Sequence, residues 1–134
     1  MQPDPRARVR VEATVAPSED PDKLLSAVKS VVGGDLREEI GRNGVKVFSA
    51  GPGTLLRLHD QFRDRHVRGA ARRLLLAGAK GNSTTVMVNR QAATVGVVVL
   101  CSAPEESPLG PIYVTVDCRG IEAVIDWLTA YREG

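Results

Sequence analysis

The sequence of 134 residues contains few aromatic residues, only two cysteines and no long apolar run. Aromatic residues make up 4% of the chain, so Val, Leu, Ile and Ala must build the core. No apolar run approaches the roughly 20 residues that a membrane-spanning helix needs. The first residues carry no basic region followed by an apolar stretch, so no signal peptide is expected. These absences predict one cytoplasmic domain over residues 1–134, with residues 1–5 as a flexible tail.

The two cysteines, Cys101 and Cys118, each end a predicted strand. A simple hairpin would leave them several residues apart, at about 3.3 Å per residue, whereas disulfide-bonded Cα atoms must lie within roughly 7 Å. We therefore expect two free, buried thiols. The histidines, His59 and His66, have no evident carboxylate and nucleophile partners. No catalytic residues, metal site or cofactor are expected.

Apolar periodicity predicts an α+β fold, with helices packed on one face of a largely antiparallel sheet. In the first strand Val9 and Val11 face one side, while Arg8 and Arg10 face the other. The predicted strands cover residues 6–16, 36–41, 45–49, 83–89, 95–101 and 112–118. The first predicted helix starts within residues 18–21 and ends near residue 32. The second starts at a capping residue, 54, and includes residue 62. The other two cover residues 67–76 and 121–132. Residues 90–94 are a turn or helical step, and 102–111 a loop.

Two short signals mark the ends of these elements. Asp20 followed by Pro21 is typical of a helix start, because the acid caps free N–H groups and Pro suits the first helical position. Asn43-Gly44 lies between two predicted strands and favours a type I′ turn, which requires positive φ values.

Basic residues gather in the middle of the chain. Residues 51–100 hold eight Lys or Arg against two Asp, and residues 101–134 hold two Arg against six acids, although the overall charge is only +2. A dense basic segment attracts polyanions, and phosphate backbones are their commonest form. The composition therefore favours RNA as a partner.

The arginines of the predicted helix over 67–76 form a stripe on a helical wheel. With Val67 at the centre of the inner face, Arg65 and Arg72 point outward, and Arg68 lies at the flank. Such a stripe can grip phosphates bidentately, or it can be a solvated face paired to Asp60 and Asp64. The apolar inner set is Val67, Ala70, Ala71, Leu74 and Leu75. Leu76 falls on the outward side, which indicates a partner surface or dimer contact.

Three polar or rigid segments follow. Lys80–Thr85 could hold a phosphate through backbone N–H groups and hydroxyls, or could be a polar turn entering a strand; its spacing is not that of a P-loop. Asn89-Arg90-Gln91 offers side chains able to read RNA. Ser107–Pro111 has two prolines and a glycine, which fix a loop for recognition or set the register of neighbouring strands.

Several short segments, spread in order over the chain, form a set: Val15–Asp20, Ala71–Leu76, Gly81–Thr85, Asn89–Ala93 and Glu106–Ile112. Together they resemble a family of uncharacterised archaeal proteins of about this length. The resemblance implies a fold similar to that of the large-subunit ribosomal protein that binds 5S rRNA, and a tendency to dimerise. It carries over no catalytic residues. Positions after Asn82 that are often aromatic in such proteins are Val86 and Met87 here, which argues against base stacking on this strand.

The leading hypothesis is thus a small RNA-binding protein that acts as a homodimer and has no enzymatic activity. Its predicted RNA-binding residues are Arg63, Arg65, Arg68, Arg72, Arg73, Lys80, Asn82, Asn89, Arg90 and Gln91. One alternative is a protein–protein module whose basic face meets an acidic partner. Another is an enzyme acting on a phosphorylated small molecule, with a pocket near Lys80 to Asn89.

Overall fold

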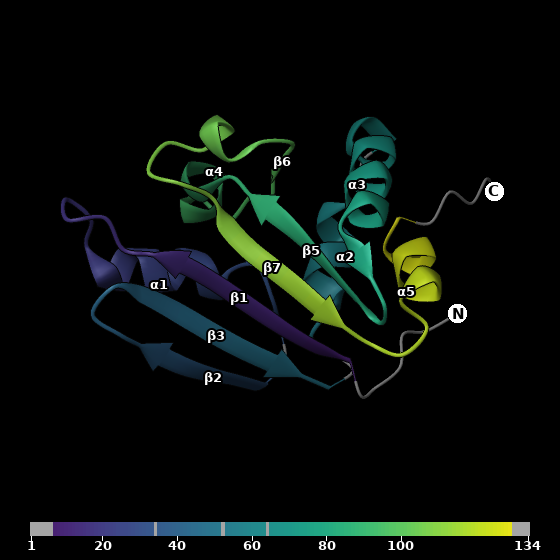
Figure 1. Cartoon of the computed structure of the whole chain (residues 1–134), viewed down its shortest axis with the longest axis horizontal. Coiled ribbons are helices and arrows are strands. Elements are labelled where there is room, and N and C mark those ends of the chain that lie inside the picture. The colour runs from purple at the N-terminus through teal and green to yellow at the C-terminus, as the bar shows by residue number, and fades with distance from the viewer. Residues whose placement is uncertain (1–6, 34, 52, 64, 130–134) are drawn as a thin grey trace.

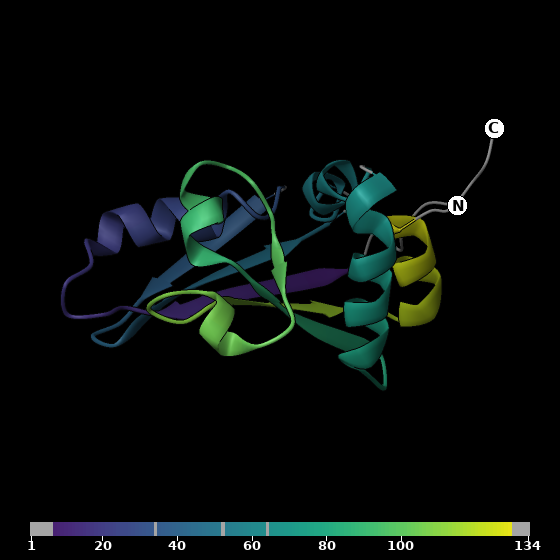
Figure 2. The ribbon, with the colours of Figure 1, turned by 90° about the horizontal axis from the view of Figure 1, so that it is seen from above.

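The computed structural model describes residues 7–33, 35–51, 53–63 and 65–129, and shows an antiparallel sheet with helices on one face (Figures 1 and 2). Within these residues the chain forms seven strands, five α-helices and one short 3-10 helix. The predicted α+β class is therefore confirmed. The proposed tail, residues 1–5, lies outside the described residues. None of the described helices is both long and apolar enough to cross a membrane.

The strands are ordered β2-β3-β1-β7-β5-β4, with β6 also beside β5, and each pair is antiparallel. They are β1 (Arg8–Thr14), β2 (Asp35–Ile40), β3 (Gly44–Ala50), β4 (Ala79–Lys80), β5 (Ser83–Val88), β6 (Leu100–Cys101) and β7 (Ile112–Asp117). Val11 of β1 lies opposite Val47 of β3 and Val114 of β7, and all three are fully buried. Because side chains alternate along a strand, these valines form the face that the helices cover.

The helices lie together on that face (Figure 2). They are α1 (Pro21–Lys29), α2 (Leu56–Gln61), α3 (Arg65–Ala77), α4 (Arg90–Thr94) and α5 (Ile121–Leu128), with the 3-10 helix η1 (Pro104–Glu106) in the loop before β7. Helix α1 starts as predicted, since the Asp20 carboxylate accepts a hydrogen bond from the backbone N–H of Asp22 and Pro21 is the first helical residue. It ends at Lys29, before the predicted end near Val32.

The hairpin between β2 and β3 forms where it was predicted, but its turn is of a different type. Among the described residues, positive φ values occur at Leu109 and at five glycines, and neither Asn43 nor Gly44 is one of them. The type I′ turn is therefore wrong. Gly44 has another reason to be glycine: a Cβ there would lie 2.9 Å from the backbone oxygen of Ala13 on β1. Close packing, and not an unusual φ, requires glycine at this position.

The predicted strand over residues 95–101 is mostly wrong, because only β6 pairs with β5. In the antiparallel register of β6 with β5, residues 95–99 would lie opposite residues 89–93, but β5 ends at Val88 and Asn89 caps α4, so no strand is there for them to pair with. Val95, Val97 and Val99 consequently lie in a loop, with 77%, 45% and 45% of their surface exposed.

Thr54 does not cap α2 as predicted, since the cap position is Leu55. The Thr54 hydroxyl is instead fully buried and donates to Ser49 Oγ at 2.5 Å, and Ser49 Oγ donates to the backbone oxygen of Gly33 at 2.5 Å. This chain of hydrogen bonds ties the start of α2 to β3 and to the end of the α1 segment. At the other terminus, α5 ends at Leu128, and the predicted residues 130–132 lie outside the described part of the chain.

Neither cysteine forms a disulfide and both are buried, as expected. Burial raises the pKa of the Cys101 thiol above its ordinary value of 9.0, and the negative charge of Glu106 adds to the rise. The thiol therefore ionises at lower pH in the unfolded chain than in the folded chain. At neutral pH it is protonated in both states, and its stabilising effect on the folded state is fully present. We expect stability to decline as the pH rises above 9.

Urea unfolding measured from neutral pH to above pH 9 tests this expectation, with Cys101→Ala as the comparison. The variant should lose part of the alkaline decline, because it has no thiol to ionise in the unfolded state. An identical pH dependence in both proteins would contradict the role of Cys101.

Candidate nucleic-acid interface

Helix α3 is rotated relative to the predicted wheel. Ala71 and Leu75 are its most buried residues, whereas Val67 is 40% exposed and Ala70 is exposed. The inner stripe therefore lies further around the helix, toward Arg68, which is half-buried. The cause is that α3 packs against both α5 and β5, and a broad apolar stripe does not by itself fix its centre.

This rotation removes two arginines from the predicted outward stripe. Arg72 donates from Nη1 to Asp126 Oδ1 of α5 at 2.5 Å, and its side chain is only 38% exposed. Arg68 is half-buried and has a contact of its own within the protein. The side chain of Arg65 lies outside the described residues. The continuous stripe of outward arginines is thus wrong for Arg68 and Arg72.

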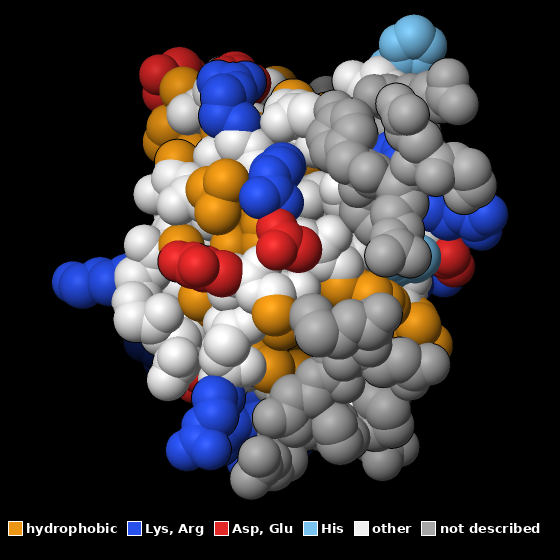
Figure 3. Space-filling model, turned by 90° about the vertical axis from the view of Figure 1, so that its right-hand side faces the viewer, with side chains coloured by type: hydrophobic (Ala, Val, Ile, Leu, Met, Phe, Trp, Pro, Cys, Tyr) orange, Lys and Arg blue, Asp and Glu red, His pale blue; other side chains and the backbone are white. Residues whose placement is uncertain are grey.

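Arg63 and Arg73 remain exposed on this side of the molecule. Arg63 lies 3.9 Å from Asp60, a loose pair between two well-exposed side chains. Figure 3 shows the end of the molecule that includes α5, where basic side chains are scattered among acidic ones and do not gather in one patch. Any phosphate bound at this end of the molecule would therefore contact isolated basic side chains and not a continuous basic patch.

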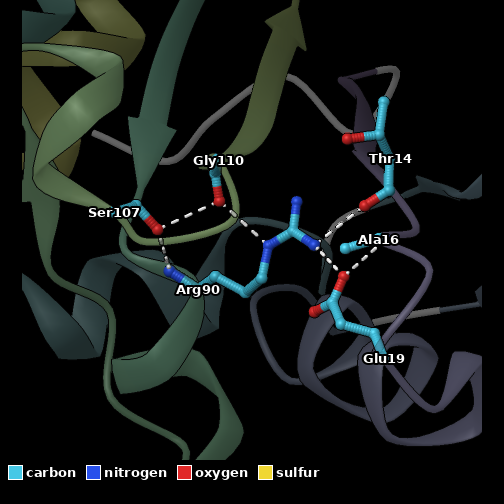
Figure 4. Close-up of polar contacts among 6 residues, drawn as sticks. All are labelled: Thr14, Ala16, Glu19, Arg90, Ser107 and Gly110. Atoms are coloured by element: carbon cyan, nitrogen blue, oxygen red, sulfur yellow. Dashed lines mark hydrogen bonds and ion pairs between the residues drawn. The ribbon is translucent and has the colours of Figure 1, made fainter.

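Arg90 is buried and cannot reach an external ligand, with 2% of its surface exposed. Its Nη1 donates to Glu19 Oε1 at 2.5 Å and to the backbone oxygen of Thr14 at 2.8 Å, and its Nε donates to the backbone oxygen of Gly110 at 2.9 Å (Figure 4). Its backbone N–H donates to Ser107 Oγ. The prediction that Arg90 binds RNA is therefore wrong.

The Arg90 cluster joins segments that are distant in the sequence. Ser107 Oγ donates onward to the backbone oxygen of Gly110 at 3.0 Å, and Glu19 Oε1 also accepts from the backbone N–H of Ala16 at 2.9 Å. Three of the segments that carried the family resemblance, Val15–Asp20, Asn89–Ala93 and Glu106–Ile112, thus meet around one guanidinium (Figure 4). In this structure the three segments connect the end of β1, the start of α4 and the loop before β7 to one another.

The remaining predicted residues lie at opposite ends of β5. Lys80 ends β4 and Asn82 lies in the turn before β5, and both are exposed, whereas Asn89 and Gln91 follow β5. At about 3.4 Å per residue, the two groups are separated by roughly 20 Å. The Asn89 side chain is also occupied, because its Oδ1 accepts from Ala92 N at 3.0 Å as the cap of α4, and its Nδ2 donates to the Glu106 backbone oxygen at 3.3 Å. These residues do not form one site.

The sheet face opposite the helices was missed by sequence reasoning. Figure 1 looks toward this face, and Figure 2 shows the helices on the other side. One end of this face holds a groove of about 690 Å³. The groove residues that carry polar or aromatic groups are Arg8, Arg10, Arg37, Phe48, Ser49, Ser83, Thr115 and Asp117.

The strand register explains how these side chains converge. Arg10 of β1 lies opposite Phe48 of β3 on one side and Thr115 of β7 on the other, and Arg37 of β2 lies opposite Phe48. The Arg37 guanidinium carbon lies 4.6 Å from the centroid of the Phe48 ring, which is a cation–π contact. The groove therefore has a stacked aromatic–guanidinium pair beside further cations.

Charge is unevenly distributed along this face. Among the described residues Arg8 has no ion pair within 4 Å, although Asp117 lies opposite it in the register. Arg10 lies 3.7 Å from Glu12 and Arg37 lies 3.5 Å from Glu39, both in exposed or half-exposed positions. Exposed pairs at these distances are weak, so the cations stay available to a phosphate.

The other end of the face has a different character. A second groove of about 650 Å³ lies there. Its lining includes Glu12, Glu39, Ile40, Lys46 and Tyr113. Lys46 is 3.8 Å from Glu12, so acids offset the cation. The open face thus has a basic end and a mixed end.

The sequence contained one signal for this face, the outward alternation of Arg8 and Arg10 on the first strand. That pattern shows which side chains point away from the core. It does not show whether helices or loops will cover them. Among the described residues no group of three or more His, Cys, Asp or Glu side chains could hold a metal ion.

The fold and this face together define a class, an α+β protein with a helix-backed antiparallel sheet whose other face is open. The chain matches no protein-family model. It is 39% identical over 125 residues to a UPF0201 protein of Sulfolobus acidocaldarius, covering 91% of this chain and 86% of that one. It is 37% identical over 127 residues to a UPF0201 protein of Aeropyrum pernix, covering 92% and 85%. The chain belongs to the UPF0201 family.

Solved structures agree with this membership. The crystal structure of an uncharacterised UPF0201 protein superposes with a TM-score of 0.79 at 24% identity, covering 95% of this chain and 97% of the other. That of a UPF0201 protein from Methanococcus jannaschii gives a TM-score of 0.74 at 23% identity, covering 95% and 96%. At this level of identity the likeness concerns the fold.

Proposed function

We propose that the protein binds single-stranded RNA in the cytoplasm across the open face of the sheet. The observation that carries the proposal is the basic groove, in which Arg8, Arg10 and Arg37 surround Phe48. Sheets that bind single-stranded RNA stack bases on aromatic rings or guanidinium planes, and backbone phosphates are held by cations. Arg37 over Phe48 presents such a plane, and Arg8 and Arg10 lie within the same groove.

Two further points support the proposal. The Thr85 and Thr115 hydroxyls, 3.0 Å apart on neighbouring strands of this face, can exchange hydrogen bonds with 2′-hydroxyls or base edges. The fold similarity to the 5S-rRNA-binding ribosomal protein, which the sequence resemblance implies, also favours RNA. The exposed Arg63, Arg73 and Lys80 would add electrostatic attraction at longer range.

Salt dependence of binding tests the groove directly. A single-stranded oligouridine of about twelve nucleotides fits a sheet platform of this kind and can be followed by fluorescence anisotropy. Each phosphate contact contributes about 0.7 to the slope of log affinity against log salt on single strands. The double variant Arg8→Ala/Arg10→Ala should therefore reduce that slope by about 1.4.

The matched control is Arg63→Ala/Arg73→Ala, which removes the same charge from the helix side. It should weaken binding slightly through the overall field and leave the slope close to that of the wild type. A fall in slope with the helix pair and none with the groove pair would contradict the open-face site.

A protein–protein module is the second candidate, and the exposed apolar loop favours it. Val95, Val97 and Val99 are each at least 45% exposed. Val99 and Val67 also line a shallow cleft of about 160 Å³ between this loop and α3, where Arg73 lies as well. An acidic partner with apolar side chains would suit that cleft. Equal affinity of the protein for RNA and for heparin would favour the protein–protein module over specific RNA binding.

A further inference from the structure

Register partners line up in rows across the open face of the sheet. One of these rows, here called the central row, runs at right angles to the strands from β2 to β5 (Figure 1). Its members, one on each of five neighbouring strands, are Arg37, Phe48, Arg10, Thr115 and Thr85. Because neighbouring strands lie about 4.8 Å apart, the row is roughly 19 Å long. It is therefore long enough for more than one nucleotide.

The rows on either side of the central row carry acids. On one side Lys46 lies opposite both Glu39 and Glu12, so two carboxylates offset one ammonium group. On the other side Arg8 lies opposite Asp117. The central row itself has two guanidinium groups and no acid. Since carboxylates repel phosphates, a backbone that runs across the strands along this row is favoured over one that runs along the strands.

The two ends of the central row differ in chemistry. At β2 and β3 the guanidinium carbon of Arg37 lies 4.6 Å from the ring centroid of Phe48, and the pair offers a plane to a base. At β7 and β5 the hydroxyls of Thr115 and Thr85 lie 3.0 Å apart. Strands β3 and β7 are separated by about 10 Å, whereas a base is bonded directly to its own sugar. A base at the stack and a group at the threonines therefore belong to different nucleotides.

The threonine pair has the hydrogen-bonding capacity that suits a hydroxyl. Thr85 is exposed and Thr115 is half-buried, so a ligand on the open face can reach both. Each hydroxyl has one donor and two lone pairs, and one of the two protons is used in the bond between them. The pair thus keeps one free donor beside free lone pairs. A phosphate oxygen only accepts, but a 2′-hydroxyl both donates and accepts and can bond to both threonines at once.

We infer that the pair of Thr85 and Thr115 selects ribose over deoxyribose in an RNA strand that crosses the sheet along the central row. This inference rests on the proposed function and names a specificity determinant for it. The threonines bind the sugar of one nucleotide, whereas Arg37 and Phe48 hold the base of another whichever sugar it carries. A DNA strand would keep the stacking and the phosphate contacts and would lose the hydrogen bonds of the 2′-hydroxyl.

Oligouridine and oligodeoxyuridine of about twelve nucleotides test the inference, because they share one base and differ only in the 2′-hydroxyl. In fluorescence anisotropy the wild type should bind oligouridine about tenfold more tightly, as expected for hydrogen bonds that only RNA makes. The double variant Thr85→Val/Thr115→Val should lose this preference, with weaker binding of RNA and unchanged binding of DNA. Valine keeps the branched shape and suits a strand, so the sheet should be retained.

Two further variants serve as controls. Thr94 is exposed on α4, on the helix side of the sheet, so Thr94→Val should keep the tenfold preference. Arg37→Ala removes the plane offered to the base. It should weaken binding of both oligonucleotides by a similar factor and keep the preference, because the stacked base is the same in each.

The outcomes separate this inference from the proposed function. Equal affinity of the wild type for the two oligonucleotides, or a preference that survives the loss of both threonine hydroxyls, would overturn the inference and leave RNA binding in place. Unchanged affinities in Arg37→Ala would also overturn it, because the strand would then not follow the central row. Failure of the wild type to bind oligouridine at all would overturn the proposed function, and this inference with it.

Discussion

Replacing Arg90 with Met should lower the free energy of unfolding by about 3–5 kcal/mol, because it removes one partner of a buried ion pair. The Arg90 side chain is 3% exposed and that of Glu19 is 14% exposed, so the remaining carboxylate has little access to water. The backbone oxygens of Thr14 and Gly110 would also lose a donor. Methionine fills a similar volume, so the loss reflects the missing charge and hydrogen bonds and not a cavity.

Urea unfolding at neutral pH measures this loss, and Gln91→Met is the control. Gln91 is the next residue of α4 and is exposed, so its replacement should change stability by no more than about 0.5 kcal/mol. Arg90→Lys should recover only part of the loss, because lysine restores the charge but not the planar arrangement of donors. A loss below about 1 kcal/mol for Arg90→Met would show that the cluster contributes little.

The burial of Arg90 illustrates what the sequence could not show. Its neighbours in sequence, Asn89 and Gln91, are polar, and a polar run is typical of a surface. Its partners, Glu19 and the loop around Gly110, are about 70 and 20 residues away. Only the folded topology brings them together. Counting the basic residues of the segment therefore overestimates the cations available to a ligand, because Arg90 is paired with Glu19 in the interior.

Local signals predicted local structure well. The Asp20-Pro21 helix start, the alternation on β1 and the hairpin at residues 41–44 depend on contacts between near neighbours, and the structure confirms their positions. The class of fold followed from the order of these elements. Predictions that depended on distant contacts failed. Helix α3 is rotated because it packs against both α5 and β5, and residues 95–99 form no strand because β5 ends where α4 begins.

The same limit explains why the candidate site changed. Sequence reasoning placed RNA on the α3 arginines, because charge density along the chain is visible without a fold. The open face depends on an absence, namely that the described helices lie on the other side of the sheet (Figure 2). Phe48 falls within the predicted strand over residues 45–49, and the sequence does not show that Arg37 of the neighbouring strand lies over its ring.

Gly78→Ala should be the most disruptive replacement of a single glycine, with a loss of about 3 kcal/mol. A Cβ at this position would lie 2.1 Å from the backbone oxygen of Thr85. Thr85 cannot easily retreat, because its N–H donates to the Gly78 carbonyl oxygen at 3.2 Å and β7 holds the other side of β5, with Thr115 opposite Thr85. The clash is therefore between two anchored backbones, and no side chain can rotate to relieve it.

Thermal unfolding and hydrogen exchange measure this effect, with Gly41→Ala as the matched control. The nearest atom to a Cβ at Gly41 is 3.7 Å away, an ordinary contact, so that variant should keep its melting temperature within a few degrees. Gly78→Ala should lower the melting temperature by about 10 °C. It should also speed exchange of the Thr85 amide, because the bond between Thr85 and Gly78 closes the edge of β5. Equal melting temperatures for the two variants would mean that α3 can shift away from β5, and the tight junction between them would then not be a source of stability.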